Sequence, residues 1–370
     1  MSTPSQILNK IQEKIKIWHN IDSSQITVKF LPSMSNVVYL VHVNLEIQSK
    51  ILENEPVRVL YREFATGLLD ELINRKVENE LFQFLADTGL GPKLLYVDPE
   101  IRIEEFICGT PLTGEDMIDP QSQLTLMKVL PQYHTLKPDS IKRETPFDTF
   151  IFSMRMHELI EEKRKFTDFA DSENEKIDTI LKTINKDFLS EIKANLNEHP
   201  QGLVVSHNDL LNGNIMRMGE DQFTLIDYEY MSFNYPGYDI ANFCNECMFD
   251  YSYPHAPNFK IHKEKRPTGD NLLRLYKLYI ITFDKCKKGK EFPILDSFDD
   301  HETLDALWNE NPEKYSKILE KLLRLHKYNM IVSHLYWLLW AIIVSKNPRI
   351  DFDYIEFSWE RFQDVQELMN

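Results

Sequence analysis

The chain has 370 residues, of which 42% are hydrophobic and 27% charged, a composition typical of a globular protein with one large domain or two ordinary ones. Its formal net charge of −16 leaves no basic excess to neutralise phosphates, which argues against nonspecific nucleic-acid binding. An acidic chain is compatible with a cationic substrate, although many proteins are acidic for solubility alone.

The first hundred residues alternate helical and strand patterns. Residues 5–18 predict an amphipathic helix, and residues 74–89 predict another that ends at a glycine, the usual residue past a helix C-terminus. Alternating apolar segments predict the strands QITVKFL, VVYLVHVNLEI, VRVLYREF, PKLLYVD and IRIEEFI. This part of the chain is therefore predicted to be a five-stranded antiparallel sheet with an inserted helix.

The character of the sequence changes after the turn-rich segment CGTPLTG, so we predict two domains, 1–108 and 109–370. The second is predicted to be mainly helical, with a strand–loop–strand at 203–229 as the exception. The whole chain is therefore expected to have an α+β fold. Its predicted helices cover 119–136, 149–165, 173–197, 237–250, 270–287, 312–345 and 355–369.

Cysteines and apolar runs indicate the compartment. Four cysteines are too few for a disulfide scaffold and favour a reducing, cytoplasmic setting. Cys244 and Cys247 form a single CxxC without a second ligand pair, which favours buried thiols over zinc. The N-terminal segment lacks the features of a signal peptide. Residues 328–345 are apolar but begin with several polar residues, which predicts a buried helix and no integral membrane association.

The segment SHNDLLNGNI (206–215) gathers polar groups between two short strand patterns, and TLIDYEY follows it. Phosphoryl transfer needs a base for a hydroxyl proton and oxygen ligands for magnesium on the nucleotide phosphates. Kinase-like sites use an Asp, an Asn five residues later and a second Asp after the next strand. Asp209, Asn214 and Asp227 have this spacing. Asn, Asp and Gly also cluster in turns, but the whole pattern favours a catalytic site. His207 is predicted to hold the loop in shape through hydrogen bonds.

Several motifs in the same order resemble those of the choline/ethanolamine kinases. HNDLLNGNI is followed by IDYEY, YPGYDIANFCNE and DYSY, and the similarity continues at LGPKLL, SHLYWLLWAII, IDFDY and RF. It covers most of the chain from about residue 31 onward. The resemblance implies a protein-kinase-like two-lobe fold and transfer of the γ-phosphate of ATP to choline or ethanolamine. It also implies a possible homodimer.

The resemblance assigns roles at matching positions. Asp209 would be the catalytic base and would lie at the substrate, and Asn214 and Asp227 would hold Mg²⁺. Glu229 would lie near the metal or the substrate. In the N-terminal lobe, Arg62 would contact the ATP phosphates with Glu78 as its ion-pair partner. The adenine would be bound through the backbone of a hinge that comprises Glu104, Glu105, Phe106 and Ile107.

Two positions depart from the family pattern. The phosphate loop of the family carries glycines, whereas this chain has PSMSN, residues 32–36, without any. Ser35 and Asn36 could still donate hydrogen bonds to ATP from a stiffer loop. Glu105 stands where the family commonly has Gln, a change of small effect if backbone groups bind adenine.

The resemblance also places the amine site. Trp337 and Trp340 lie three residues apart on one helix face, and Tyr251, Phe357 and the carboxylate of Glu246 would complete the site. Aromatic rings can hold a quaternary ammonium, which favours choline, but both branches of the family share the two tryptophans, so this pair alone does not decide the amine. Tryptophan pairs on apolar helices are usually core residues, and only the family placement argues otherwise. The alternatives are ethanolamine kinase, an aminoglycoside-type small-alcohol phosphotransferase, and a non-catalytic pseudokinase scaffold.

Overall fold

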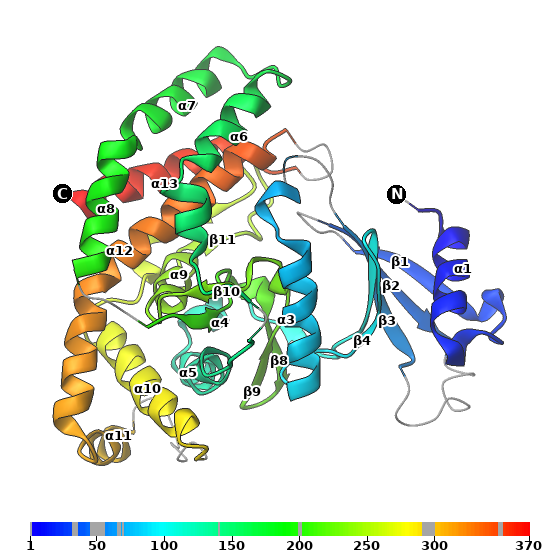
Figure 1. Ribbon diagram of the computed structural model, residues 1–370, viewed down its shortest axis with the longest axis horizontal. Coiled ribbons are helices and arrows are strands. Elements are labelled where there is room, and N and C mark those ends of the chain that lie inside the picture. The colour runs from blue at the N-terminus through cyan, green and yellow to red at the C-terminus, as the bar shows by residue number, and fades with distance from the viewer. Residues whose placement is uncertain are drawn as a thin grey trace. The chain divides into compact units, whose positions relative to one another are not determined.

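The computed structural model describes residues 2–31, 36–44, 56–64, 68, 70–139, 141–198, 202–290, 300–346 and 351–370. The chain divides into two compact units, Met1–Cys108 and Gly109–Asn370 (Figure 1). The first contains the large sheet, and the second contains most of the helices.

The first unit is built on a five-stranded antiparallel sheet with the strand order β1-β2-β3-β5-β4. Helix α1 packs on one face of this sheet, and α3 lies on the other side (Figure 1). The elements are α1 (Pro4–Lys14), β1 (Ile26–Leu31), β2 (Val37–Val43), β3 (Arg58–Glu63), α3 (Arg75–Thr88), β4 (Leu94–Val97) and β5 (Ile101–Glu105), with single 3-10 turns at Lys16–Trp18, Ser23–Gln25 and Asp70–Leu72.

The alternation of side chains along the strands explains the two faces of this sheet. Val59, Tyr61 and Ile103 are buried in one apolar cluster with Ile7 and Ile11 of α1. The intervening residues of β3 and β5 point to the opposite face, because successive side chains of a strand alternate. Three of these are charged and lie on the side of α3: Arg62, Arg102 and Glu104.

The second unit is mainly helical with short strands. Its helices are α4 (Gly114–Ile118), α5 (Pro120–His134), α6 (Arg155–Arg164), α7 (Asp171–Thr183), α8 (Lys186–Glu198), α9 (Tyr238–Glu246), α10 (Gly269–Lys287), α11 (His301–Trp308), α12 (Pro312–Val344) and α13 (Tyr354–Met369). Its strands are β6 (Thr110–Pro111), β7 (Val204–Ser206), β8 (Ile215–Gly219), β9 (Gln222–Leu225), β10 (Ser232–Asn234), β11 (Phe249–Asp250) and β12 (Lys260–Ile261). They form a three-stranded sheet, β6-β8-β9, and the pairs β7–β10 and β11–β12.

Helix α12 is the central helix of the second unit. It packs against α13, α9, α10, α6 and α8 (Figure 1). All residues from Asn329 to Val344 are buried, which confirms the buried helix predicted there. Across the part of the chain that the structure describes, no helix combines the length and apolar character that crossing a membrane requires.

Helix boundaries differ from the prediction where a polar side chain interrupts the pattern. The helix predicted at 173–197 is divided into α7 and α8. Asn185 lies at the break, and its Oδ1 accepts hydrogen bonds from the N–H groups of Asp187 and Phe188, each at 3.0 Å. Such a side chain caps a new helix start, so the apolar periodicity continues across two helices instead of one.

A second predicted helix, at 149–165, is also shorter than expected. A π-type turn covers Phe147–Ile151, and α6 starts only at Arg155 because Met154 has a φ of 66°. A left-handed residue cannot continue a right-handed helix.

Candidate active site

The predicted catalytic loop leaves β7 and is held from α9 by side-chain hydrogen bonds. Both oxygens of Asp239 accept backbone N–H groups of the loop, Oδ2 from His207 and Oδ1 from Asn208, each at 2.8 Å. Asn242, one turn further along α9, accepts from the N–H of Leu210 at 2.7 Å. These bonds determine the conformation of a segment that has no regular structure of its own.

Asp239 was missed by the sequence-based prediction. It is fully buried, and its Oδ2 also lies 2.9 Å from Nε2 of His134. The available signal was its place in the motif YPGYDIANF, two residues after the glycine at which a helix is predicted to start. That position alone indicates a helix start, and only the fold shows that the side chain points back to the loop.

His207 ties the catalytic loop to the strand that leads to Asp227. Its Nε2 lies 2.8 Å from the carbonyl oxygen of Ile226. Burial lowers the pKa of His207, so the ring is neutral near pH 7 and Nε2–H donates to this carbonyl. Asn208 has a φ of 69° and donates from Nδ2 to the carbonyl of Tyr230 at 2.7 Å. The two side chains hold the loops around positions 209 and 227 next to each other.

Asp209 and Asn214 contact each other directly. Nδ2 of Asn214 donates to Oδ2 of Asp209 at 2.8 Å and to the carbonyl oxygen of Asp209 at 3.0 Å. The amide of Asn214 is thereby oriented, and its Oδ1 is the atom left for a ligand. Burial raises the pKa of Asp209, and so do the nearby negative charges of Glu246, Asp227 and Glu229.

Asp227 has an unusual backbone conformation, with φ 65° and ψ 71°. For a residue other than glycine this region costs on the order of 1–3 kcal/mol, and such strain clusters at functional sites. The N–H of the preceding Ile226 donates to the carbonyl oxygen of Asn214 at 3.0 Å, which brings the two predicted metal ligands together. Glu229 is buried in the short helical turn that follows.

The oxygen atoms of Asn214 and Asp227 suit a magnesium ion, which is usually not enclosed by protein ligands alone. Within the described ranges, no three His, Cys, Asp or Glu side chains are grouped closely enough to enclose a metal ion. Magnesium usually takes one or two carboxylates from the protein and its other oxygens from phosphates and water. Asp227 and the oriented amide oxygen of Asn214 fit that role.

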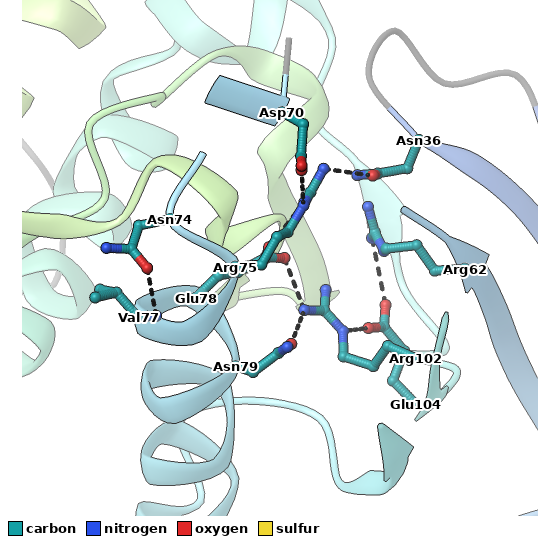
Figure 2. A network of polar contacts seen from close by, with 10 residues as sticks. All are labelled: Asn36, Arg62, Asp70, Asn74, Arg75, Val77, Glu78, Asn79, Arg102 and Glu104. Atoms are coloured by element: carbon teal, nitrogen blue, oxygen red, sulfur yellow. Dashed lines mark hydrogen bonds and ion pairs between the residues drawn. The ribbon is translucent and has the colours of Figure 1, made fainter. Parts of the chain in front are cut away.

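A buried ion network occupies the α3 side of the sheet in the first unit (Figure 2). Arg102 is fully buried and donates to Glu78 at 2.7 Å and to Glu104 at 2.6 Å. Arg62 donates to the other oxygen of Glu104 at 3.3 Å, and Arg75 donates to Glu78 at 2.8 Å. Three arginines therefore share two buried carboxylates.

The predicted pair of Arg62 and Glu78 lies within this network. The structure places Glu104 next to Arg62, while Arg102 and Arg75 donate to Glu78. The charge of Arg62 still contributes to the lowered pKa of Glu78, after those of Arg102 and Arg75. The spacing of Arg102 and Glu104, which places both on one face of a strand, was the signal for this network.

The remaining nucleotide residues are placed as follows. Asn36 is buried, and its Oδ1 accepts from Arg75 at 3.1 Å, whereas Ser35 lies outside the described residues. The backbone N–H groups of Glu105 and Phe106 donate to the carbonyl oxygens of Lys93 and Arg58, at 2.9 and 3.3 Å.

These bonds reduce the number of backbone groups in the predicted hinge that could bind adenine. The N–H groups of Glu105 and Phe106 are used inside the sheet, so adenine binding through this segment would rely on its other backbone groups. Among the described contacts, the N–H of Ile107 donates to no carbonyl oxygen, and adenine binding through residues 104–107 stays a prediction.

Trp337 and Trp340 of α12 belong to one aromatic cluster. The ring of Trp337 meets those of Tyr230, Tyr336 and Trp340 edge to face, with centroids 5.1–5.4 Å apart. Nε1 of Trp340 donates to the hydroxyl of Tyr230 at 2.7 Å. Tyr230 follows Glu229 directly, so this cluster adjoins the segment that carries Asp227.

Tyr251 and Phe357 belong to a second cluster, built around a buried arginine. Phe249, Tyr251 and Phe357 contact one another through their rings, and the guanidinium of Arg361 lies 4.5 Å from the ring centroid of Phe357. Arg361 also forms an ion pair with Glu246. The sequence-based prediction placed the negative charge of Glu246 in the amine site, and the structure pairs that charge with Arg361.

The predicted thiols of the CxxC segment are buried and unbridged. Cys244 and Cys247 are both free and almost fully buried, and burial raises the pKa of Cys244 to about 12. A thiol in that state is neither a nucleophile nor a metal ligand at neutral pH.

Known proteins resemble this chain over most of its length. A family model described as choline/ethanolamine kinase matches residues 27–366. The choline/ethanolamine kinase of Homo sapiens is 28% identical over 84% of this chain and 72% of its own length. The probable ethanolamine kinase A of Dictyostelium discoideum is 28% identical over 95% of this chain and 87% of its own.

A solved structure shares the fold. The choline kinase from Cryptosporidium parvum Iowa II superimposes with a TM-score of 0.70 at 22% identity, over 99% of this chain and 95% of its own. The predicted α+β, protein-kinase-like fold is confirmed. The predicted enzyme class, an ATP-dependent phosphotransferase with an alcohol acceptor, is also confirmed.

Proposed function

We propose that this chain, which belongs to the choline/ethanolamine kinase family, transfers the γ-phosphate of ATP to the hydroxyl of choline. The family assignment leaves the amine open, because relatives named for either amine are similar to this chain. The observation that carries the choice of choline is the aromatic cluster around Trp337. It joins rings from α12 with Tyr230, which follows the metal-binding segment.

The cluster is linked to the catalytic loop by short contacts. Asn242 accepts from the N–H of Leu210 and donates to Oγ of Ser333 at 3.1 Å. Ser333 lies one turn before Trp337 on the same face of α12. A quaternary ammonium has no hydrogen-bond donors and is held by ring faces. Choline would therefore lie with its hydroxyl near Asp209 and its trimethylammonium near these rings.

In this proposal each polar residue described above has one task. Asp209 accepts the proton of the choline hydroxyl as that oxygen attacks the phosphate. Asn214 and Asp227 hold Mg²⁺, which when bound neutralises charge on the nucleotide phosphates. Arg62 contacts the phosphates of ATP, and Glu104 and Arg102 position its guanidinium. His207 and Asp239 hold the loop, and Glu229 adds negative charge beside the metal.

The metal assignment predicts a changed magnesium requirement. Asp227→Ala should raise the Mg²⁺ concentration that gives half-maximal activity and should lower kcat, because a charged ligand is lost. Asn214→Ala should do the same less severely, because a neutral ligand is lost. Activity is titrated with Mg²⁺ at constant ATP, with Asp221→Ala as a control because Asp221 is exposed in the β8–β9 turn. An unchanged magnesium dependence in both variants would show that these residues are not the ligands.

The choice of amine is tested by kcat/KM for choline and ethanolamine in a coupled assay of ADP release. We expect choline to be the better substrate, and Trp337→Leu to lower the choline value by about 2–30-fold, equivalent to about 0.5–2 kcal/mol for one ring face. Trp308→Ala is the control, because Trp308 lies on α11 against Lys277 and Tyr315.

Two outcomes would contradict this proposal. Equal or better efficiency with ethanolamine would make the chain an ethanolamine kinase, the second candidate, to which the similarity with the Dictyostelium relative points. Unchanged choline efficiency in Trp337→Leu would show that the ring is a core residue.

A cytoplasmic location is part of the proposal, because all four cysteines are free thiols.

A further inference from the structure

Arg361 of α13 is a buried cation that contacts three of the predicted amine-site residues. It is 1% exposed, and its Nη2 contacts Oε1 of Glu246 and lies 3.4 Å from the hydroxyl of Tyr251. Its guanidinium lies 4.4 Å from the ring centroid of Phe249 and 4.5 Å from that of Phe357. One side chain therefore contacts the carboxylate, the hydroxyl and the rings.

Both carboxylate oxygens of Glu246 are engaged inside the protein. Oε1 accepts from Arg361, and Oε2 accepts from the hydroxyl of Tyr251 at 2.6 Å. The neighbouring His334 has a Nδ1 3.4 Å from Nη1 of Arg361, and burial lowers the pKa of His334 to about 4. His334 is therefore neutral near pH 7, and the charges of Glu246 and Arg361 offset each other.

Glu246 lies on the face of α9 that holds the catalytic loop. Asp239, Asn242 and Glu246 are separated by three and four residues, so they line one face of the helix. The first two of them bind the backbone of His207, Asn208 and Leu210. Glu246 is thus the next carboxylate along the surface that faces Asp209.

We propose that Arg361 is a specificity-determining residue, which favours a quaternary over a primary ammonium because it occupies the carboxylate of Glu246. The inference rests on the proposed amine site. A primary ammonium brings three N–H donors and needs acceptors when it leaves water, whereas a trimethylammonium needs none. With Glu246 bound to Arg361 and Tyr251, this part of the site offers rings and withholds the carboxylate of Glu246. Arg361 acts through Glu246 and is a positioning residue.

The test is the ratio of kcat/KM for choline to that for ethanolamine in four variants. Arg361→Met removes the cation and frees Glu246, so the ratio should fall about tenfold or more, the effect of one charge-assisted hydrogen bond to ethanolamine. Arg361→Lys keeps the charge and should stay within about threefold of the wild-type ratio. The double variant Glu246→Gln/Arg361→Met should return to about the wild-type ratio, because no carboxylate is left to free.

Tyr251→Phe keeps the test decisive if Arg361→Met does not fold, which thermal unfolding followed by circular dichroism would show. This substitution frees only Oε2 of Glu246. It should lower the choline-to-ethanolamine ratio about threefold, because ethanolamine gains one hydrogen bond that is weaker than the bond to a fully freed carboxylate. The inference would be overturned if Arg361→Met lowered kcat/KM equally for both amines. If Arg361→Met is unfolded, an unchanged choline-to-ethanolamine ratio in Tyr251→Phe would overturn it instead. The wild-type ratio tests the choice of choline separately, since the inference concerns only how the ratio changes.

Discussion

Asp209→Asn is expected to lose about 10²–10⁴-fold in kcat while its affinity for ATP is retained. Asn has the shape of Asp but cannot accept the hydroxyl proton of the acceptor alcohol. Its carbonyl oxygen can still accept from Nδ2 of Asn214, which lies 2.8 Å from Oδ2 of Asp209, so the loop should keep its conformation. Single-turnover rates measure the chemical step, and calorimetric titration with ATP measures nucleotide affinity.

The matched control for this prediction is Asp221→Asn, in the turn between β8 and β9. Asp221 is exposed and accepts only a surface hydrogen bond from Gln121, at 2.9 Å, among the described contacts. Its kcat should equal that of the wild type. If folded Asp209→Asn kept more than about a tenth of wild-type kcat, Asp209 would not be the general base.

Arg102→Met is expected to lower the free energy of unfolding of the first unit by about 3–5 kcal/mol, the cost of removing one partner from a buried ion pair. The substitution leaves Glu78 and Glu104 buried with less positive charge beside them. Burial raises the pKa of both carboxylates, but the neighbouring arginines lower it overall. Arg102 has the largest lowering effect of these arginines on each carboxylate. The guanidinium also lies 4.2 Å from the ring centroid of Phe82, and that packing is lost as well.

Arg58→Met is the matched control, because Arg58 lies exposed on the neighbouring strand β3. A surface substitution of this kind usually changes stability by less than about 0.5 kcal/mol. Hydrogen exchange of amides in α3 and β5 reports the first unit separately from the helical unit, which matters because two units need not unfold together. A loss below about 1 kcal/mol in Arg102→Met would mean that the carboxylates are compensated by Arg62 and Arg75 alone.

Local sequence patterns were sufficient for features that depend on neighbours in the chain. The amphipathic pattern and Gly89 predicted α3, which ends with that glycine at a φ of 75°. The apolar run at 328–345 predicted the buried part of α12, and the spacing of Asp209 and Asn214 predicted two side chains that are in contact. Periodicity and spacing carry this information because the residues involved share one helix, strand or loop.

What the sequence by itself determined is therefore the class of the fold, the family and the contact between Asp209 and Asn214. Only the tertiary structure decided which charges are paired: Arg102 with Glu78, 24 residues away, and Arg361 with Glu246, 115 residues away. It also turned Asp239 toward the backbone of the catalytic loop. The reason is that a buried charge takes whichever partner the packing brings within hydrogen-bond distance, and the packing of distant elements has no periodic signature along the chain.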